Sequence, residues 1–553
     1  MILNNVLVFL ALLMTGCGKE QPVEKEETKQ PAGYAELVQA HKDGKVFLSA
    51  EHQSGTCVIS FTDGFKLTVS ENEMKIQDCT SQNPSEVKAE SGWWTVGGIY
   101  TGVKADSSLS DENALPVYVY FDTKTLYMYL SNRNVLSFAS KALEDEKQEQ
   151  EELDRIQNIP VIRITTDGGA GIYDKKNYVK GEISISDPGN LYSDVKEFTA
   201  RMGIRGRGNS TWGWPKKPWK VKLDEKASLL GMPADKEWAL LANYADRTLV
   251  RNIVAMKLSE ICGFSWTPRM RSVEVYLNDE YQGVYTLCEH KKVSSDRVNI
   301  DVVGESDNSG DAVTGGYYLE IEEQQDETTC WWTSMGVPMM FSDPEVPTAE
   351  QLAYVTGLFD SFEQALKNRK WSESDGYPQY IDVDSFINYY IVQELTKNVD
   401  GNLRKSSFIT KERGKKMEMY HLWDFDLTLG NCGYFDSRVG NGPEGFWIRD
   451  YNSKSVYGEG WFHRLFEDPA FVDAVQKRWN ELMPELEKIP EFIDDQAFRL
   501  EPARKRNFEK WNINESVDWV NFPSLGSYEK ELEYLKDFYS TRLEWLDAEL
   551  NRI

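Results

Sequence analysis

The sequence predicts an α+β protein in which a small antiparallel β domain precedes a larger domain, β-rich in its first half and helical in its second. Three observations support this. Short alternating strands separated by turn residues occupy roughly residues 34–138, a charged segment poor in apolar residues follows, and the apolar spacing later changes from period 2 to period 3.6. Such a succession of strands and then helices is typical of the α+β class.

On this interpretation the chain has five parts. We expect a signal peptide, a tether, a small β domain, a charged helical linker and a large domain over residues 1–16, 17–33, 34–140, 141–157 and 158–553, in that order. In the large domain, the spacing predicts a hairpin with its turn near Asn278 and Asp279, and helices over 246–262 and through the last 200 residues or so.

The first residues suggest a membrane anchor. The apolar run Val6–Met14 is too short to span a bilayer, and "LMTGC" resembles the bacterial lipobox, in which the cysteine is lipidated. We therefore expect lipidation of Cys17, with a soluble body held at the bacterial cell envelope, on the outer membrane or the cell surface. An ordinary cleaved signal peptide is the alternative.

Charge and cysteine content exclude other classes. A formal net charge of −27 argues against a general nucleic-acid binder, so any polyanion site must be local. The six cysteines after Cys17 show no metal-binding spacing. We expect one disulfide, Cys57 with Cys79, and the alternative is that these are unpaired buried cysteines.

One stretch is strongly basic in this acidic chain. Between residues 201 and 222 there are seven lysines and arginines and no Asp or Glu: Arg201, Arg205, Arg207, Lys216, Lys217, Lys220 and Lys222. Read as a strand, "WKVKL" places Lys220 and Lys222 on one face. The same alternation places Arg205 with Arg207, beside glycines that leave the backbone uncovered. Cations next to exposed amides suit phosphate oxygens, whereas the alternative is a solvated edge strand.

A second group of residues is acidic. Residues 406–423 predict a β-hairpin, with Asp400 just before it and Asp424 and Asp426 just after it. Paired strands lie about 5 Å apart, so the open end of the hairpin brings Asp400 close to Asp424. Three explanations remain: a Mg²⁺ site for phosphoryl transfer, the acid and nucleophile of a glycosidase, or a structural cluster. The basic stretch favours the first.

Several long motifs resemble the CotH family of atypical, spore-coat-type protein kinases: "RGRGNSTWGWPKKPWKVKL", "SLLGMPADKEWALLANYADRTLVRN", "GGYYLEIE", "YYIVQELTKNVDG" and "WDFDLTLGN". The resemblance covers roughly residues 159–542. It implies a kinase-like bilobed fold, with a β-rich N-lobe and a helical C-lobe, that uses ATP and Mg²⁺. It also implies that Asp400 is the general base and that Asp424 binds the metal.

The remaining site residues are assigned from the residue patterns. Lys220 is the predicted phosphate-contacting lysine, with Lys222 and Lys217 as alternatives, and the glycine-containing loop places Arg205, Arg207 and Asn209 near the phosphates. Asp426 is either a second metal ligand or an acceptor that orients the first. Glu289 either pairs with the lysine or is a surface glutamate.

Two functions follow from these expectations. The first is a lipid-anchored kinase that transfers the γ-phosphate of ATP to a hydroxyl group of a protein or glycan acceptor. The second is a non-catalytic, kinase-like envelope protein that binds a polysaccharide or a protein partner. Neither involves nucleic acid.

Overall fold

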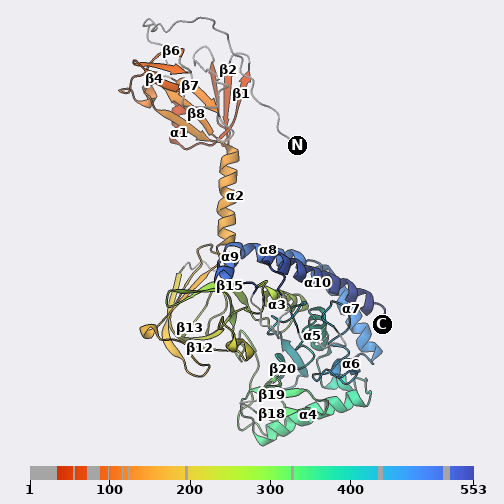
Figure 1. Ribbon diagram of the computed structural model, residues 1–553. Coiled ribbons are helices and arrows are strands. Elements are labelled where there is room, and N and C mark those ends of the chain that lie inside the picture. The colour runs from red at the N-terminus through yellow and green to blue at the C-terminus, as the bar shows by residue number, and fades with distance from the viewer. Residues whose placement is uncertain are drawn as a thin grey trace. The chain divides into compact units, whose positions relative to one another are not determined.

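The computed structural model describes residues 34–553 except 54–55, 71–86, 97–98, 115, 122–124, 193–196, 325–328, 434–439 and 515–523 (Figure 1). The expected signal peptide, the tether with Cys17, and Cys79 lie outside these residues. No helix in the described part is long and apolar enough to cross a membrane. The chain divides into two compact units, residues 1–153 and 154–553.

The first unit contains helix α1 (Tyr34–Lys42) and three antiparallel sheets. The sheets consist of β1 (Phe47–Gln53), β2 (Thr56–Phe61) and β3 (Lys66–Ser70); β4 (Val87–Glu90), β5 (Trp93–Val96) and β6 (Ile99–Lys104); and β7 (Pro116–Phe121), β8 (Thr125–Leu130) and β9 (Val135–Ala139). The antiparallel pairing agrees with the alternating pattern of the sequence. The charged segment that was expected as a linker forms helix α2 (Lys141–Gln157), and the division between the units falls within it.

The second unit begins with a closed barrel in the order β10-β11-β12-β13-β14-β16-β15. Its strands are β10 (Val161–Thr166), β11 (Val179–Ser186), β12 (Glu197–Gly206), β13 (Trp219–Ala227), β14 (Asp235–Leu241), β15 (Met270–Leu277) and β16 (Glu280–Glu289). Parallel pairing of β10 with β15 closes the barrel, and the other neighbours are antiparallel. The predicted hairpin is confirmed as β15–β16, with positive φ angles at Asn278 and Asp279.

Alternation along β13 fills the barrel interior. Trp219, Val221 and Leu223 are at most 3% exposed and belong to the apolar core of the barrel, whereas Lys220 and Lys222 lie on the other face. The predicted split between apolar and basic faces is therefore confirmed. An apolar interior leaves the lysines to the outside of the barrel.

The rest of the second unit combines a five-stranded sheet with helices around a second, larger core (Figure 1). The sheet has the order β18-β19-β17-β20-β21, from β17 (Tyr317–Ile321), β18 (Cys330–Trp332), β19 (Pro338–Asp343), β20 (Ser407–Lys411) and β21 (Met417–His421). The helices are α3 (Arg251–Cys262), α4 (Ala349–Lys367), α5 (Val383–Leu395), α6 (Trp461–Leu465), α7 (Pro469–Leu486), α8 (Ile489–Arg499), α9 (Glu501–Lys510) and α10 (Tyr528–Leu550).

Local signals explain where two of these helices begin. The Thr348 hydroxyl accepts a hydrogen bond from the Gln351 backbone N–H and the Gln351 side chain accepts one from the Thr348 N–H, which forms a capping box for α4. The Asp382 side chain caps α5 by accepting a hydrogen bond from the Ser385 N–H. The helix expected from residue 246 begins instead at Arg251, because Asp246 and Thr248 form a hydrogen-bonded turn before it. The mixed α+β class is thus observed.

Candidate functional site

A cavity of about 540 Å³ lies in the second unit, where the segment after β12 faces the open end of the β20–β21 hairpin. Its wall is rich in charged and polar side chains: Arg207, Asn209, Lys291, Glu320, Glu322, Asp400, Arg404, Lys405, Asp424 and Asp426. The volume falls in the range of pockets that hold small molecules.

The hairpin brings the predicted carboxylates to this cavity. Strands β20 and β21 pair antiparallel, as predicted, and Asp400 precedes them while Asp424 and Asp426 follow. The Asp400 N–H donates to Asn398 Oδ1 at 3.1 Å, which fixes the turn that carries the carboxylate. A Cβ added to Gly401 would lie 2.3 Å from Gln393 Oε1 and 3.0 Å from Asn398 Cβ, so a larger residue here would require the Gln393 side chain to move.

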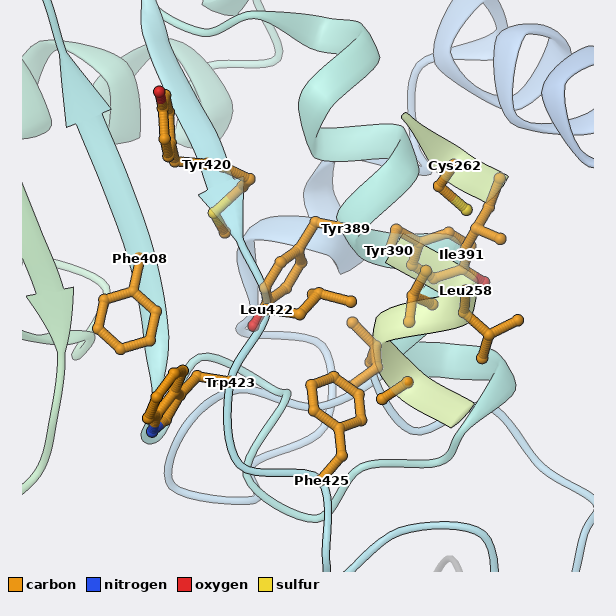
Figure 2. Packing of buried hydrophobic residues seen from close by; sticks show 14 of the residues in the cluster. Leu258, Cys262, Tyr389, Tyr390, Ile391, Phe408, Tyr420, Leu422, Trp423 and Phe425 are labelled. Carbon is orange, nitrogen blue, oxygen red and sulfur yellow. The ribbon is translucent and has the colours of Figure 1, made fainter. Parts of the chain in front are cut away.

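Asp424 adopts an unusual backbone conformation between two buried neighbours. Its φ is +66°, in the left-handed region that aspartate tolerates better than most residues. Trp423 and Phe425 are 5% and 0% exposed and insert into the core (Figure 2). Because both neighbours are anchored, the backbone turn directs Asp424 to the cavity wall.

Buried hydrogen bonds hold the loop that follows Asp424. Asn252 Oδ1 accepts the Phe425 N–H at 2.8 Å. The Arg251 guanidinium is 1% exposed and pairs with Asp246 at 2.6 Å, and its Nε donates to the Thr428 carbonyl. The start of α3 therefore fixes the position of the metal-site loop expected from the sequence.

The three carboxylates all have raised pKa values. Burial raises the pKa of Asp400 to about 6, with Arg404 and Lys405 opposing that rise. Loss of water at the cavity wall also raises the pKa of Asp424, against the effect of Arg207. The pKa of Asp426 is raised well above its ordinary value, first by burial and then by the charge of Asp424. Their raised pKa values indicate a site that favours a compensating cation or proton.

Cations line the same cavity. Lys291 donates to both carboxylate oxygens of Glu320. Arg404 forms a bidentate pair with Glu323, at 2.9 and 2.8 Å, and its guanidinium lies 3.8 Å from Asp400 Oδ1. These groups place positive charge beside the carboxylates.

One arginine of the basic stretch also reaches the cavity wall. The Arg207 guanidinium lies 5.7 Å from the centroid of the Trp423 ring. Asn209 lines the wall two residues further along. The cavity therefore receives positive charge from both β-rich parts of the unit.

The predicted lysines of the basic stretch lie elsewhere. Lys220 and Lys222 pair with Glu237 of the neighbouring strand at 3.0 and 3.4 Å, and Lys217 donates to the Trp212 carbonyl. None of the three is among the described residues that line the cavity. Alternation along β13 explains this placement, because it puts Lys220 and Lys222 on the outer face of the barrel, where they meet Glu237 of β14. Their phosphate contact stays a prediction.

Two further predicted residues have partners of their own. The Arg205 guanidinium lies 4.9 Å from the Tyr178 ring and donates to the Lys175 carbonyl, so it does not share the position of Arg207. Glu289 is fully buried, and it accepts from the Arg269 backbone N–H and guanidinium rather than from a lysine.

The expected uncovered backbone is found only in part. Gly208 lines the cavity, but Gly206 lies beneath the Trp212 indole, which a Cβ there would approach to 2.5 Å. His421 is 1% exposed and stacked on Phe408, as a packed rather than a catalytic histidine would be.

Lys291, Glu320 and Arg404 line the cavity but were not predicted from the sequence. Lys291 and Glu320 lie 29 residues apart, and only the fold brings them together. A signal for Arg404 and Lys405 was present, since a basic pair follows Asp400 by four and five residues in "VDGNLRK".

The aspartates of the cavity wall fit one hard cation that also binds a substrate. No group of three or more His, Cys, Asp and Glu is arranged around a metal position in the part of the chain that the structure describes. Mg²⁺, however, commonly binds one or two carboxylates together with phosphates and waters. Asp424 and Asp426 supply such a pair. Asp400 Oδ1 is buried and accepts no hydrogen bond from the described residues, so this carboxylate retains an unused acceptor.

Comparison with known proteins identifies the family. The family model described as CotH kinase protein matches residues 204–546, which is more than half of the chain and includes every residue of the cavity wall. The chain therefore belongs to the CotH kinase family. No curated protein matches it.

The raised pKa of Asp400 predicts that Asp400→Asn stabilises the fold. Because the folded-state pKa of about 6 exceeds the ordinary 3.8, the folded protein binds more protons between these values, and its stability falls as the pH rises through them. We expect Asp400→Asn to raise the free energy of unfolding by about 2 kcal/mol at pH 8, with the gain disappearing below about pH 4. Urea denaturation with a metal chelator present measures both values.

Asp360→Asn is the matched control, because Asp360 is exposed on α4. It should change stability little at either pH. Equal stabilisation by Asp400→Asn at pH 4 and pH 8 would contradict the prediction.

Proposed function

We propose that this CotH family member is a phosphotransferase that transfers the γ-phosphate of ATP, with Mg²⁺, to a hydroxyl group of a protein or glycan acceptor. The observation that carries the proposal is the joint presence of Asp400, Asp424 and Asp426 with Arg207 and Lys291 on one cavity wall. Carboxylates for a metal beside cations for phosphates are what phosphoryl transfer requires. A glycosidase has no use for the cations.

The barrel and the helical part would then act as the two lobes of a kinase-like arrangement. The segment after β12, with Arg207 and Asn209, would cover the phosphates from the barrel side. The loops on either side of the β20–β21 hairpin would supply the base and the metal ligand, the order also found in ordinary kinases. The lipid anchor on Cys17 and the location at the cell envelope are part of the same proposal.

Asp400 would accept the proton of the attacking hydroxyl. Its backbone is held by the hydrogen bond to Asn398, and its Oδ1 accepts no hydrogen bond from the described residues. Because its pKa is about 6, Asp400 is ionised at pH 7.5, and we expect the rate to fall as the pH drops below about 6.

Asp424 and Asp426 would hold the metal, and the cations would bind the phosphate oxygens. Bound Mg²⁺ supplies positive charge to the transferring phosphate. Lys291 is oriented by Glu320, and Arg207 packs against Trp423, so both cations are positioned before a nucleotide arrives. This preorganisation lowers the cost of binding a highly charged ligand.

Removal of either key carboxylate tests the proposal directly. With labelled ATP and Mg²⁺, we expect the unmodified chain to incorporate phosphate into itself or an added protein or glycan, and Asp400→Asn and Asp424→Asn each to lower this by at least roughly a hundredfold. Asp424→Asn should also weaken ATP binding in calorimetry, whereas Asp400→Asn should leave it nearly unchanged.

Asp360→Asn again serves as the control and should retain full incorporation. If calorimetry detects no nucleotide binding to the unmodified chain, the kinase proposal fails. The alternative of a non-catalytic envelope protein that binds a polysaccharide or a protein would then account better for the fold.

A pair of lysine variants tests which lysine contacts the phosphates. Lys291 lines the cavity, whereas Lys220 pairs with Glu237 in the barrel. We expect Lys291→Gln to raise the KM for ATP roughly tenfold or more, and Lys220→Gln to have the smaller effect. The reverse order, measured by steady-state kinetics on both variants, would assign the phosphate contact to Lys220.

A further inference from the structure

A second cavity in the same unit takes no part in the proposed phosphotransfer. It has a volume of about 390 Å³ and lies where the end of β18 and the turn after it, the end of α4, the turn at 452–456 and helix α6 meet. Its wall includes Trp332, Lys367, Asn452, Lys454, Glu459 and Arg464. We call it the basic pocket.

The basic pocket carries positive charge on an acidic protein. Lys367 and Lys454 are both exposed, and neither forms an ion pair within the described residues. Arg464 lies 2.8 Å from Glu467, but Glu467 also binds Arg369, so the arginine charge is only partly offset. Glu459 is the acidic residue of the described wall. The pocket therefore suits an anionic ligand.

The walls are fixed by buried hydrogen bonds. Glu363, fully buried on α4, accepts from the Ser334 hydroxyl, the Met335 N–H and the Trp461 indole N–H. The Lys367 ammonium in turn donates to the Ser334 carbonyl and hydroxyl. A ligand would therefore meet a preformed site, which reduces the entropy lost on binding.

The opposite wall is equally ordered and touches the catalytic loop. Asn452 Oδ1 accepts from the Lys454 and Val456 backbone N–H groups, which closes the turn that presents Lys454. The Asn452 carbonyl accepts from Asn402 Nδ2 at 2.8 Å, and Asn402 follows Asp400 by two residues. One turn thus contributes to the basic pocket and supports the loop of the proposed base.

We propose that the basic pocket docks an acidic peptide segment of the acceptor protein. The identity of the peptide as part of an acceptor rests on the proposed function. Binding of an acidic peptide by the pocket does not, because the pocket itself needs no ATP. The three cations come from three separate elements, which suits several carboxylates spaced along an extended chain. Trp332 is 47% exposed, but the Lys454 ammonium lies 4.9 Å from its ring centroid. The ammonium group therefore lies over the indole face on which a sugar would have to stack.

Calorimetry without nucleotide tests this assignment. At low ionic strength, we expect the chain to bind hexaglutamate and not hexalysine. The double variant Lys367→Gln/Lys454→Gln should weaken hexaglutamate binding roughly tenfold, since each exposed ion pair contributes about two- to fivefold. Raising the salt concentration should weaken binding to the unmodified chain more than binding to the double variant.

The matched control is Lys477→Gln/Lys530→Gln, which removes two exposed lysines from α7 and α10 and should leave the Kd unchanged. Thermal melting confirms that both double variants are folded. The proposal is overturned if hexaglutamate does not bind, or if the Lys367/Lys454 variant binds it as tightly as the unmodified chain does. It is also overturned if hexagalacturonate binds more tightly than hexaglutamate and depends on the same lysines, because the ligand is then an acidic glycan. None of these outcomes depends on whether the chain transfers phosphate.

Discussion

The site requires three carboxylates to be held on one cavity wall, where their charged forms are disfavoured. Loss of water is the first cause of the raised pKa values of Asp400, Asp424 and Asp426, and neighbouring carboxylates add to it at Asp400 and Asp426. Side chains in such positions would turn away unless the backbone held them. The fold meets this need with the positive φ of Asp424 between two buried neighbours and with the hydrogen bond from the Asp400 N–H to Asn398.

Buried hydrogen bonds and ion pairs hold the backbone segments of this unit in fixed positions. Arg251 and Asn252 at the start of α3 hold the loop after Asp424, although they lie more than 170 residues before it. The Glu394 carboxylate on α5 accepts three successive backbone N–H groups at residues 447–449, and the Arg542 guanidinium pairs with it. Side chains of α3, α5 and α10 thereby hold backbone segments that are distant from them in the sequence. Loss of a partner in such a pair leaves a buried charge, which is costly.

Local patterns predicted the carboxylate half of the site well. The β20–β21 hairpin follows from its strand and turn residues, and its ends alone bring Asp400 and Asp424 to one cavity. In the cationic half, local patterns predicted Arg207 and contained a signal for Arg404 and Lys405, whereas Lys291 and the partners of Lys220 depend on tertiary contacts. Lys220 was placed on the correct face of β13, yet the sequence could not reveal that Glu237 lies beside it. Lys291 shows the same limit, because Glu320 reaches it only through the five-stranded sheet.

The two cavities of the second unit differ in charge, and we propose that they bind different ligands. The first gathers groups of both signs, as a metal-bound nucleotide requires, and the second is mainly basic. One hydrogen bond, from Asn402 to the Asn452 carbonyl, joins the loop after Asp400 to the wall of the basic pocket. An acceptor held there would be anchored to the same turn that supports Asp400.

The proposed phosphotransfer requires Asp424 and Asp426 to hold a metal-bound nucleotide in the first cavity. Crystals grown with Mn²⁺ and a non-hydrolysable ATP analogue test it most directly, because manganese is located by its anomalous scattering. We expect an anomalous peak within about 2.5 Å of an Asp424 carboxylate oxygen, with the nucleotide phosphates beside Arg207 and Lys291. A nucleotide bound elsewhere, or manganese remote from Asp424, would contradict it.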